Sequence, residues 1–168
     1  MSRSMRLGLF LAFLISAFAA DQVSKQIALE QFANPARVVE VFSFFNLRLG
    51  FNSGISFGLF ATDSPYILIS LTAVVIAILA WWAFRAQSAM EAAALGLIVG
   101  GALGNLIDRI RHGAVVDFLD VFYKDWHWPT FNVADIMIVS GTLLLVLTSL
   151  RQSRTPNLSR KAEFPKSE

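Results

Sequence analysis

Residues Gly100 to Asp135 read GGALGNLIDRIRHGAVVDFLDVFYKDWHWPTFNVAD. An apolar, glycine-rich run leads into a polar and aromatic segment, and a second long apolar run begins at its end. A carboxylate at the boundary between apolar chain and water costs free energy unless other groups interact with it. We therefore interpret Asp117 and Asp135, which lie on either side of the aromatic residues, as a candidate catalytic pair at a membrane surface.

The composition indicates an integral membrane protein. Of the 168 residues, 55% are hydrophobic and 15% are charged, whereas a soluble domain carries about 25% charged residues. The apolar residues also gather in long runs rather than spreading evenly. The chain has no cysteine, which excludes disulfides and thiolate metal sites, and its net charge of +2 is too small to indicate a nucleic acid partner.

Four apolar runs predict four transmembrane helices, at about residues 5–25, 65–84, 91–109 and 134–150. We expect a mainly α-helical membrane fold in which these helices form one domain over residues 1–150. The segments at about 26–64, which includes a strand-like stretch, and 110–133, a loop, are expected on the periplasmic side. Residues 151–168 are expected to form a polar, disordered cytoplasmic tail.

The first apolar run, Leu7–Ala20, has two interpretations. The preceding Arg3 and Arg6 and the small residues at the end of the run are typical of a cleavable signal peptide. The three further apolar runs favour a retained span instead. Asp21 and Lys25 then lie one helical turn apart, where they can pair, although a solvated helix end would have the same spacing.

The segment between the first two spans carries a strand pattern. Asn34–Pro35 breaks any helix. From Phe45 to Asn52 large apolar residues alternate with polar or small ones, and a period of two favours a β-strand. Asn52-Ser53-Gly54 then predicts a turn. The apolar face of this strand is expected to rest on the membrane surface or on the helices.

Small residues recur at every fourth position of the third span, at Ala92, Gly96, Gly100 and Gly104. In lipid, such a stripe allows helices to approach one another closely. A neighbouring stripe brings the side chains of Asn105 and Arg109 to one end of the same helix. The stripe itself predicts packing, and only the second set of residues is a candidate for chemistry.

The basic residues favour one orientation in the membrane. Four spans place both termini on the same side, which holds eight basic residues: Arg3, Arg6, Arg85, Arg151, Arg154, Arg160, Lys161 and Lys166. The other side holds six: Lys25, Arg37, Arg48, Arg109, Arg111 and Lys124. Because basic residues near span ends favour the cytoplasm, both termini are predicted to be cytoplasmic and the candidate pair to lie at the periplasmic face.

Asp117 and Asp135 can act as an acid–base pair if the fold brings them together. Two close carboxylates share a proton, because ionising both is unfavourable. Such a pair can deprotonate water and protonate a leaving amine, which is the chemistry of peptide hydrolysis. The residues alone leave simpler alternatives open, in which Asp135 only caps its helix and Asp117 is a solvated loop acid.

Three other acids in this region are expected to have no part in the chemistry. Asp120 and Asp125 are interpreted as solvated loop acids. Asp108 adjoins Arg109 and is expected to neutralise its charge.

Other chemistries have weaker support. His112 and His127 could join Asp117 in a metal site, but they lack the paired spacing of metal ligands, so no metal or cofactor is expected. A Ser–Lys dyad built on Lys25 has no supporting spacing either. The chain contains no nucleophile elbow and no phosphate-binding loop motif.

Five motifs follow one another along the chain: DQVSK (Asp21–Lys25), FNSGISFGL (Phe51–Leu59), GGALGNLIDRI (Gly100–Ile110), GAVVDF (Gly113–Phe118) and FNVAD (Phe131–Asp135). Each motif alone is a weak signal, but all five in this order are specific. Together they resemble the lipoprotein signal peptidase family, also called signal peptidase II. The resemblance covers nearly the whole chain except the C-terminal tail.

The resemblance implies an aspartic endopeptidase of the bacterial inner membrane that needs no metal and has Asp117 and Asp135 as its catalytic dyad. Such enzymes remove the signal peptide of a prolipoprotein just before a cysteine that carries diacylglycerol. The implied partners are these prolipoproteins, membrane lipids and the cyclic peptide inhibitor globomycin, and we expect a monomer. The residues implied to line the site and bind substrate are Asp21, Lys25, Asn52, Gly54, Asn105, Arg109 and Asn132.

The competing interpretation is a membrane protein without enzymatic activity, either a small transporter or a scaffold subunit. Ionisable residues within spans often mark ion paths. Such a path needs polar groups near the middle of the bilayer, and the second and fourth spans have almost none. The polar groups gather instead at one face of the membrane, which favours the peptidase.

Overall fold

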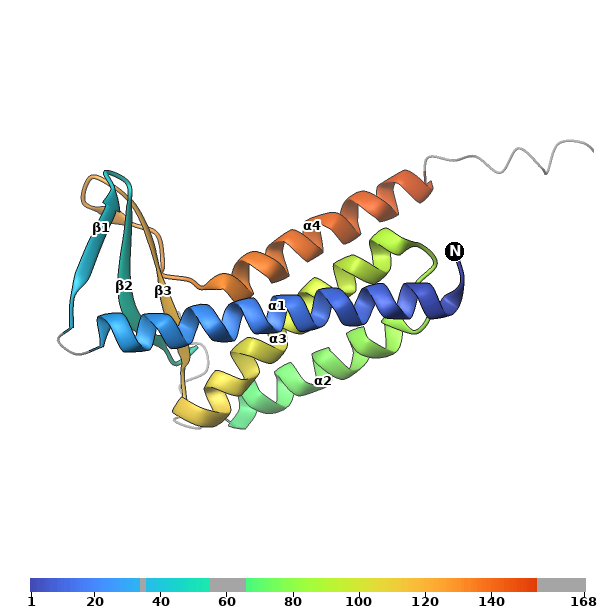
Figure 1. Cartoon of the computed structure of the whole chain (residues 1–168), viewed down its shortest axis with the longest axis horizontal. Coiled ribbons are helices and arrows are strands. Elements are labelled where there is room, and N and C mark those ends of the chain that lie inside the picture. Colours follow the sequence, from blue (N-terminus) through green and yellow to red (C-terminus); the bar gives the residue numbers. More distant parts are fainter. Residues whose placement is uncertain (34–35, 55–65, 154–168) are drawn as a thin grey trace, which may run out of the picture.

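The computed structural model describes residues 1–33, 36–54 and 66–153, which form four helices and a small sheet (Figure 1). The helices are α1 (Arg3–Phe32), α2 (Tyr66–Ala83), α3 (Ala89–His112) and α4 (Val133–Ser153). All four are long and apolar enough to cross a bilayer. The predicted fold, a mainly helical membrane protein with several spans, is therefore confirmed.

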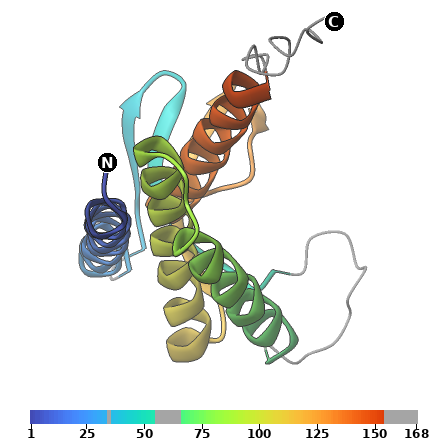
Figure 2. The same ribbon diagram turned by 90° about the vertical axis from the view of Figure 1, so that its right-hand side faces the viewer.

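Helix α3 lies in the middle of the bundle. Figure 2 shows it between α1 on one side and α2 and α4 on the other. A Cβ atom at Gly100 would lie 2.5 Å from the carbonyl oxygen of Leu14 on α1, and one at Gly101 would lie 2.6 Å from that of Ala134 on α4. Glycine is therefore required at these crossings, as the small-residue stripe predicted.

The ends of the helices follow from local sequence. The Ser88 side chain accepts a hydrogen bond from the Glu91 backbone at the start of α3, and Gly113, with a φ of 71°, ends it. Helix α1 is longer than predicted, because it continues to Phe32 instead of ending near residue 25. Proline disfavours helical backbone only at the residue before it, so Asn34–Pro35 allows the helix to continue to this point.

The sheet has four antiparallel strands in the order β1-β2-β3-β4. They are β1 (Val38–Phe42), β2 (Phe45–Asn52), β3 (Val115–Tyr123) and β4 (Trp126–His127). The bounds of β2 coincide with the alternating stretch of the sequence, so this prediction is confirmed. The sheet lies at one end of the helix bundle, beside the C-terminal end of α1 (Figure 1).

Strand β3 replaces part of the loop that was predicted over residues 110–133, and that part of the prediction is wrong. Val115, Val116, Asp117 and Phe118 are all buried. A strand that is covered on both faces lacks the alternation of apolar and polar residues that marks a half-exposed strand. This burial also places Asp117 inside the protein.

Two hydrophobic clusters connect these elements. The first lies among α1, α2 and α3 and includes Phe10, Leu95 and Val99. The second joins the end of α1 to the sheet through Phe32 and Phe118. The sheet is therefore fixed to the bundle by apolar packing as well as by its connections to α3 and α4.

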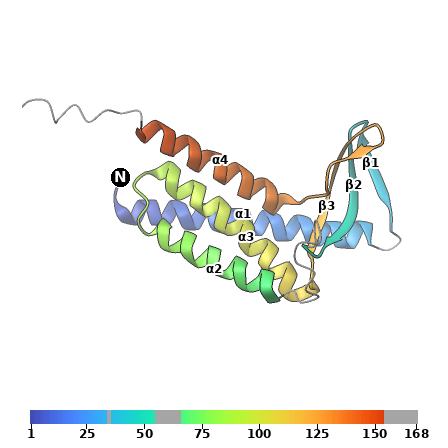
Figure 3. The same cartoon turned by 180° about the vertical axis from the view of Figure 1, so that it is seen from behind.

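The first helix starts and the last helix ends at the same end of the bundle. Figures 1 and 3 show the N-terminus of α1 and the C-terminal end of α4 at the end of the bundle opposite the sheet. Helix α4 continues to Ser153, slightly beyond the predicted span. The disorder predicted for residues 151–168 is wrong for residues 151–153, which belong to α4. Residues 154–168 lie outside the described part of the chain, as do residues 55–65.

Candidate active site

A buried ion pair in α1 forms one side of a polar network at the sheet end of the bundle. Lys25 Nζ lies 2.9 Å from Asp21 Oδ2, and both side chains are almost fully buried. The predicted pair is thus present, and the solvated helix end is excluded. A Cβ at Gly104 would overlap the Asp21 carboxylate, so this glycine of α3 makes room for the pair. The fact that α1 contributes to the network favours a retained span over a cleaved signal peptide.

Asp108 was predicted to neutralise Arg109, and this prediction is wrong. Its Oδ2 lies 2.8 Å from Lys25 Nζ and accepts a hydrogen bond from the backbone N–H of Val116 at 3.1 Å. Its Oδ1 accepts from the side-chain amide of Gln22 at 3.2 Å. Asp108 therefore connects α1, α3 and β3. Asp108 and Gln22 belong to the network, although no spacing in the sequence indicated either residue.

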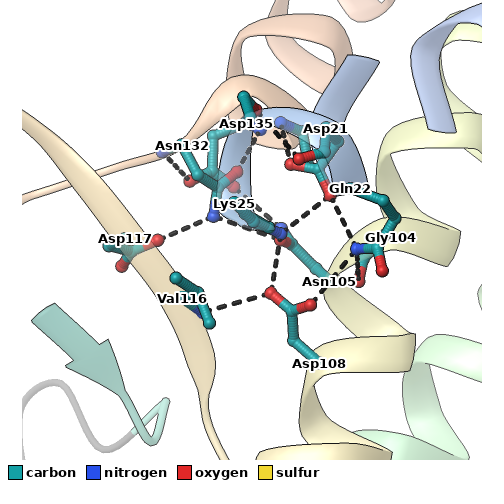
Figure 4. Close-up of polar contacts among 12 residues, drawn as sticks. Asp21, Gln22, Lys25, Gly104, Asn105, Asp108, Val116, Asp117, Asn132 and Asp135 are labelled. Carbon is teal, nitrogen blue, oxygen red and sulfur yellow. Dashed lines mark hydrogen bonds and ion pairs between the residues drawn. The ribbon is translucent and has the colours of Figure 1, made fainter. Parts of the chain in front are cut away.

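Two asparagines extend the network toward the candidate pair (Figure 4). Asn105 Oδ1 accepts a hydrogen bond from Lys25 at 2.8 Å, and its amide nitrogen donates to Asp135 Oδ1 at 3.0 Å. The amide nitrogen of Asn132 donates to Asp117 Oδ1 at 2.6 Å and to Asn105 Oδ1 at 3.2 Å. The fold thus brings Asp117 and Asp135 into one hydrogen-bonded cluster through these two amides.

Asp135 also forms part of the N-terminal cap of α4. Its backbone N–H donates to Asn132 Oδ1 at 3.0 Å, and its Oδ2 accepts from the Asn132 backbone at 3.2 Å. Another backbone donor in the first turn of α4, the N–H of Ala134, donates a hydrogen bond to Asp21 Oδ1 at 2.9 Å. The cap explains how the carboxylate is oriented, and its second oxygen still faces Asn105. The capping alternative therefore describes only part of its contacts.

Asp117 is buried and incompletely paired, so the solvated loop acid is excluded. Its side chain is 1% exposed, and its Oδ2 has no hydrogen-bond partner within the described residues. Burial raises the pKa of Asp117 to about 6, and the negative charge of Asp135 contributes in the same direction. The amides of Asn52 and Asn132 and the charge of Lys25 lower this pKa and limit the shift.

An open groove leads to Asp117 from outside. It encloses about 410 Å³. Gly50 lies opposite Asp117 in the pairing of β2 with β3, and the absence of a side chain there keeps the groove clear. The lining residues are Arg48, Gly50, Phe51, Asn52, Ser53, Asp117, Pro129 and Thr130. Asp117 therefore borders the groove, although its side chain is almost fully buried.

Asn52 lines this groove, and Gly54 lies between Asn52 and Arg109. Gly54 N donates to Asn52 Oδ1 at 2.9 Å, and Gly54 has a φ of 81°, which confirms the predicted turn. A Cβ at Gly54 would lie 3.8 Å from Arg109 Nη2 and would overlap Leu68. A side chain at this position would therefore clash with Leu68 as well as strain the backbone.

The expectation for Asp120 is also wrong, because its carboxylate is fully buried in the sheet. It accepts from His127 Nδ1 at 2.8 Å and from Arg48 Nε at 3.1 Å, and it lies 3.5 Å from Asn46 Nδ2. Asp125, in contrast, is exposed as predicted. Within residues 1–33, 36–54 and 66–153, no cluster of three or more His, Cys, Asp or Glu side chains has the arrangement of a metal site.

The chain is similar to known membrane peptidases over most of its length. The family model of signal peptidase (SPase) II matches residues 13–151. A lipoprotein signal peptidase from Anaplasma phagocytophilum is 43% identical over 136 residues, which cover 80% of this chain and 86% of that protein. Another from Nitrobacter hamburgensis is 44% identical over 151 residues, which cover 84% and 90%.

The fold is also similar to that of solved structures. One, of a bacterial membrane enzyme, has a TM-score of 0.74 and 27% identity over 86% of this chain and 94% of that chain. These similarities do not favour the transporter or scaffold alternative. Because the family model covers most of the chain and the curated relatives match it nearly from end to end, the chain belongs to the signal peptidase II family.

Proposed function

We propose that this protein is an aspartic endopeptidase that cleaves the signal peptide from diacylglyceryl-modified prolipoproteins, just before the lipidated cysteine. Its relatives carry the name lipoprotein signal peptidase. The observation that carries the proposal for the site is the contact of Asp117 and Asp135 with the same asparagine, Asn132, at the inner end of an open groove.

In the proposed reaction, Asp117 and Asp135 share one proton. The ionised carboxylate takes a proton from water, and the resulting hydroxide attacks the scissile carbonyl. The protonated carboxyl then supplies the proton that the leaving amine requires. The raised pKa of Asp117 supports this scheme, because it keeps a proton available near neutral pH. The titration is expected to belong to the pair rather than to either residue.

The other polar residues have two proposed roles. Asp21, Lys25 and Asn105 position the dyad through the buried network. Asn132 bridges the two carboxylates. On the substrate side, Asn52, Gly54 and Arg109 bind the backbone of the signal peptide near the scissile bond. This role is supported by the position of Asn52 in the groove wall and by the proximity of Gly54 to both Asn52 and Arg109.

The location of the site suits a substrate that is already in the membrane. A signal peptide is an apolar helix, so it approaches sideways through the bilayer while its scissile bond reaches the surface. We place both termini in the cytoplasm and the sheet at the periplasmic face of the bacterial inner membrane, as the basic residues favour. We also expect the enzyme to act as a monomer and to bind globomycin.

The test is the cleavage of a lipidated prolipoprotein by the purified protein in detergent or vesicles. Asp117→Asn and Asp135→Asn are each expected to lower kcat by about a hundredfold or more, since each removes an acid–base group. Asp125→Asn is the matched control, because the same change at an exposed aspartate of the sheet is expected to leave turnover unchanged.

Near-normal turnover by either dyad variant would exclude the proposed dyad. The same assay with a chelator tests a metal mechanism, which predicts a collapse of activity, whereas the dyad predicts none. Circular dichroism of each variant shows whether a loss of turnover reflects a loss of helix instead. A wild-type protein that fails to cleave lipidated substrates, yet cleaves unlipidated ones, would contradict the substrate assignment.

A further inference from the structure

A second groove lies between the end of α1 and the strands β1 and β2. It encloses about 480 Å³ and shares Arg48 and Phe51 with the groove that leads to Asp117. The proposed cleavage reaction does not use the rest of it. Most of its wall is apolar, and the apolar residues are Phe32, Ala33, Ala36, Val38, Leu49 and Phe51.

Two arginines, Arg37 and Arg48, also line this groove, and both are anchored through Nε. Arg37 Nε donates to the backbone carbonyl of Gln31 at 2.8 Å, and its guanidinium lies 5.8 Å from the centre of the Phe32 ring. Arg48 Nε donates to the buried carboxylate of Asp120 at 3.1 Å. These contacts restrict two otherwise flexible side chains, so a ligand needs less ordering of the protein when it binds.

Both guanidinium groups keep donors that nothing else occupies. Among the residues that the structure describes, neither terminal nitrogen of Arg48 has an acceptor. Of the two terminal nitrogens of Arg37, only Nη2 has one, the side-chain oxygen of Gln31 at 3.3 Å. A guanidinium presents its N–H groups in a planar fork that fits the oxygens of a phosphate. Two cations at the edge of one apolar groove therefore favour an occupant that is both anionic and partly apolar.

The length of α1 places this groove at the level of the lipid headgroups. The helix has 30 residues, which span about 45 Å, whereas the hydrocarbon core of a bilayer is about 30 Å thick. With Arg3 and Arg6 in the headgroups of one leaflet, Phe32 at the other end of the helix lies among the headgroups of the opposite leaflet. The groove begins at Phe32, so lipid phosphates lie at its depth.

We propose that the groove between Arg37 and Arg48 is a binding site for an anionic phospholipid. The phosphate lies between the two guanidinium groups, and the glycerol and the upper acyl chain lie against the apolar wall. A free phosphate would leave that wall unused. Because Asp120 balances the charge of Arg48, the two arginines and Asp120 together carry one net positive charge, which an anionic lipid balances and a zwitterionic lipid does not. Binding would connect the end of α1 to the outer strands of the sheet, and it does not depend on the proposed peptidase activity.

Native mass spectrometry of the full-length protein in mild detergent tests the proposal, with phosphatidylglycerol and phosphatidylcholine as probes. The wild type is expected to retain phosphatidylglycerol preferentially. Arg37→Gln and Arg48→Gln are each expected to weaken its binding about fivefold, as estimated for one cation near an anionic membrane surface. Arg48→Lys is expected to be intermediate, because lysine keeps the charge but loses the fork.

Two matched variants distinguish lipid binding in the groove from general electrostatic attraction between the lipid and the protein. Lys124→Gln removes a positive charge from the same end of the molecule but outside the groove, and Arg85→Gln removes one from the opposite end. Both are expected to retain phosphatidylglycerol as the wild type does. Circular dichroism of every variant confirms that the helices are intact.

Three results would overturn the proposal. The first is undiminished retention of phosphatidylglycerol by the double variant Arg37→Gln/Arg48→Gln, or an equal loss in Lys124→Gln. The second is complete displacement of the lipid by inorganic phosphate, which would identify free phosphate as the ligand. The third is a raised KM for prolipoprotein in Arg37→Gln with unchanged lipid retention, which would assign the groove to the substrate.

Discussion

The buried carboxyl of Asp117 affects stability as well as chemistry. Burial raises its pKa from 3.8 to about 6 in the folded protein. The unfolded chain therefore releases this proton at lower pH than the folded protein does, so Asp117 lowers the free energy of unfolding as pH rises from about 4 to about 6. The shift corresponds to about 3 kcal/mol, which is fully present above pH 6.

Asp117→Asn should remove this pH-dependent loss, because the amide is neutral at every pH and its oxygen can still accept from Asn132. We expect the variant to unfold close to the wild-type temperature at pH 4 and at a higher temperature at pH 7. Thermal unfolding followed by tryptophan fluorescence at pH 4, 5, 6 and 7 measures the difference. Asp125→Asn, at an exposed position, should show no such trend. A difference between Asp117→Asn and wild type that stays constant from pH 4 to pH 7 would contradict the assigned pKa.

The sequence distinguished some carboxylates better than others. Asp117 and Asp135 were predicted from their positions between apolar runs and from family motifs. Asp108 and Asp120 were misassigned, because their burial depends on partners that are distant in the chain. Asp108 is neutralised by Lys25 of α1, and Asp120 by Arg48 of β2. No local pattern around a carboxylate reports such long-range pairs, so only the fold could assign them.

Among the helices and strands, too, some were predicted from local sequence, whereas others depend on contacts between distant parts of the chain. The β2 strand was predicted because large apolar residues alternate with polar or small ones along it. Its burial does not follow that alternation, since Asn46 is buried and Phe51 is exposed. The β3 strand was missed because residues 115–118 are buried on both sides. The spans were predicted from hydropathy alone, while the end of α1 at Phe32 depends on packing of its last turns against the sheet.

Helix packing and the polar network meet at Gly104. A Cβ at this position would overlap the Asp21 carboxylate, and that carboxylate is paired with Lys25. Gly104→Ala must therefore move α3 away from α1 or displace Asp21. We expect a loss of about 1–3 kcal/mol in the free energy of unfolding, the usual range for overpacking, together with lower turnover because the network that positions the dyad is disturbed.

Gly8→Ala is the matched control for this variant. It makes the same change in a membrane helix, but a Cβ there would meet no atom within 4 Å. Alanine favours helix over glycine, so this control should unfold at the same or a slightly higher temperature. Thermal unfolding and cleavage assays are run on both variants. If Gly104→Ala matched Gly8→Ala in both measurements, the close contact between α1 and α3 would not matter for the site.

The candidate active site lies at one end of the molecule. The sheet, whose strand β3 carries Asp117, lies at that end, and the N-terminus of α1 and the C-terminal end of α4 lie at the other (Figures 1 and 3). In the orientation that we propose, which the distribution of basic residues favours, both of these helix ends are cytoplasmic. It follows that cleavage would occur on the periplasmic side, after the mature part of a prolipoprotein has crossed the membrane.

The absence of cysteine makes this orientation directly measurable. Single cysteines are introduced at exposed positions on the two ends: Ser43→Cys in the turn between β1 and β2, Asp125→Cys in the turn between β3 and β4, and Ser4→Cys near the N-terminus. A membrane-impermeant maleimide should label the first two in intact spheroplasts and Ser4→Cys only after permeabilisation. The unsubstituted chain gives no background, and permeabilised cells confirm that each thiol is reactive. Labelling of Ser4→Cys in intact spheroplasts, with protection of the two sheet positions, would invert the topology and place the site on the cytoplasmic side.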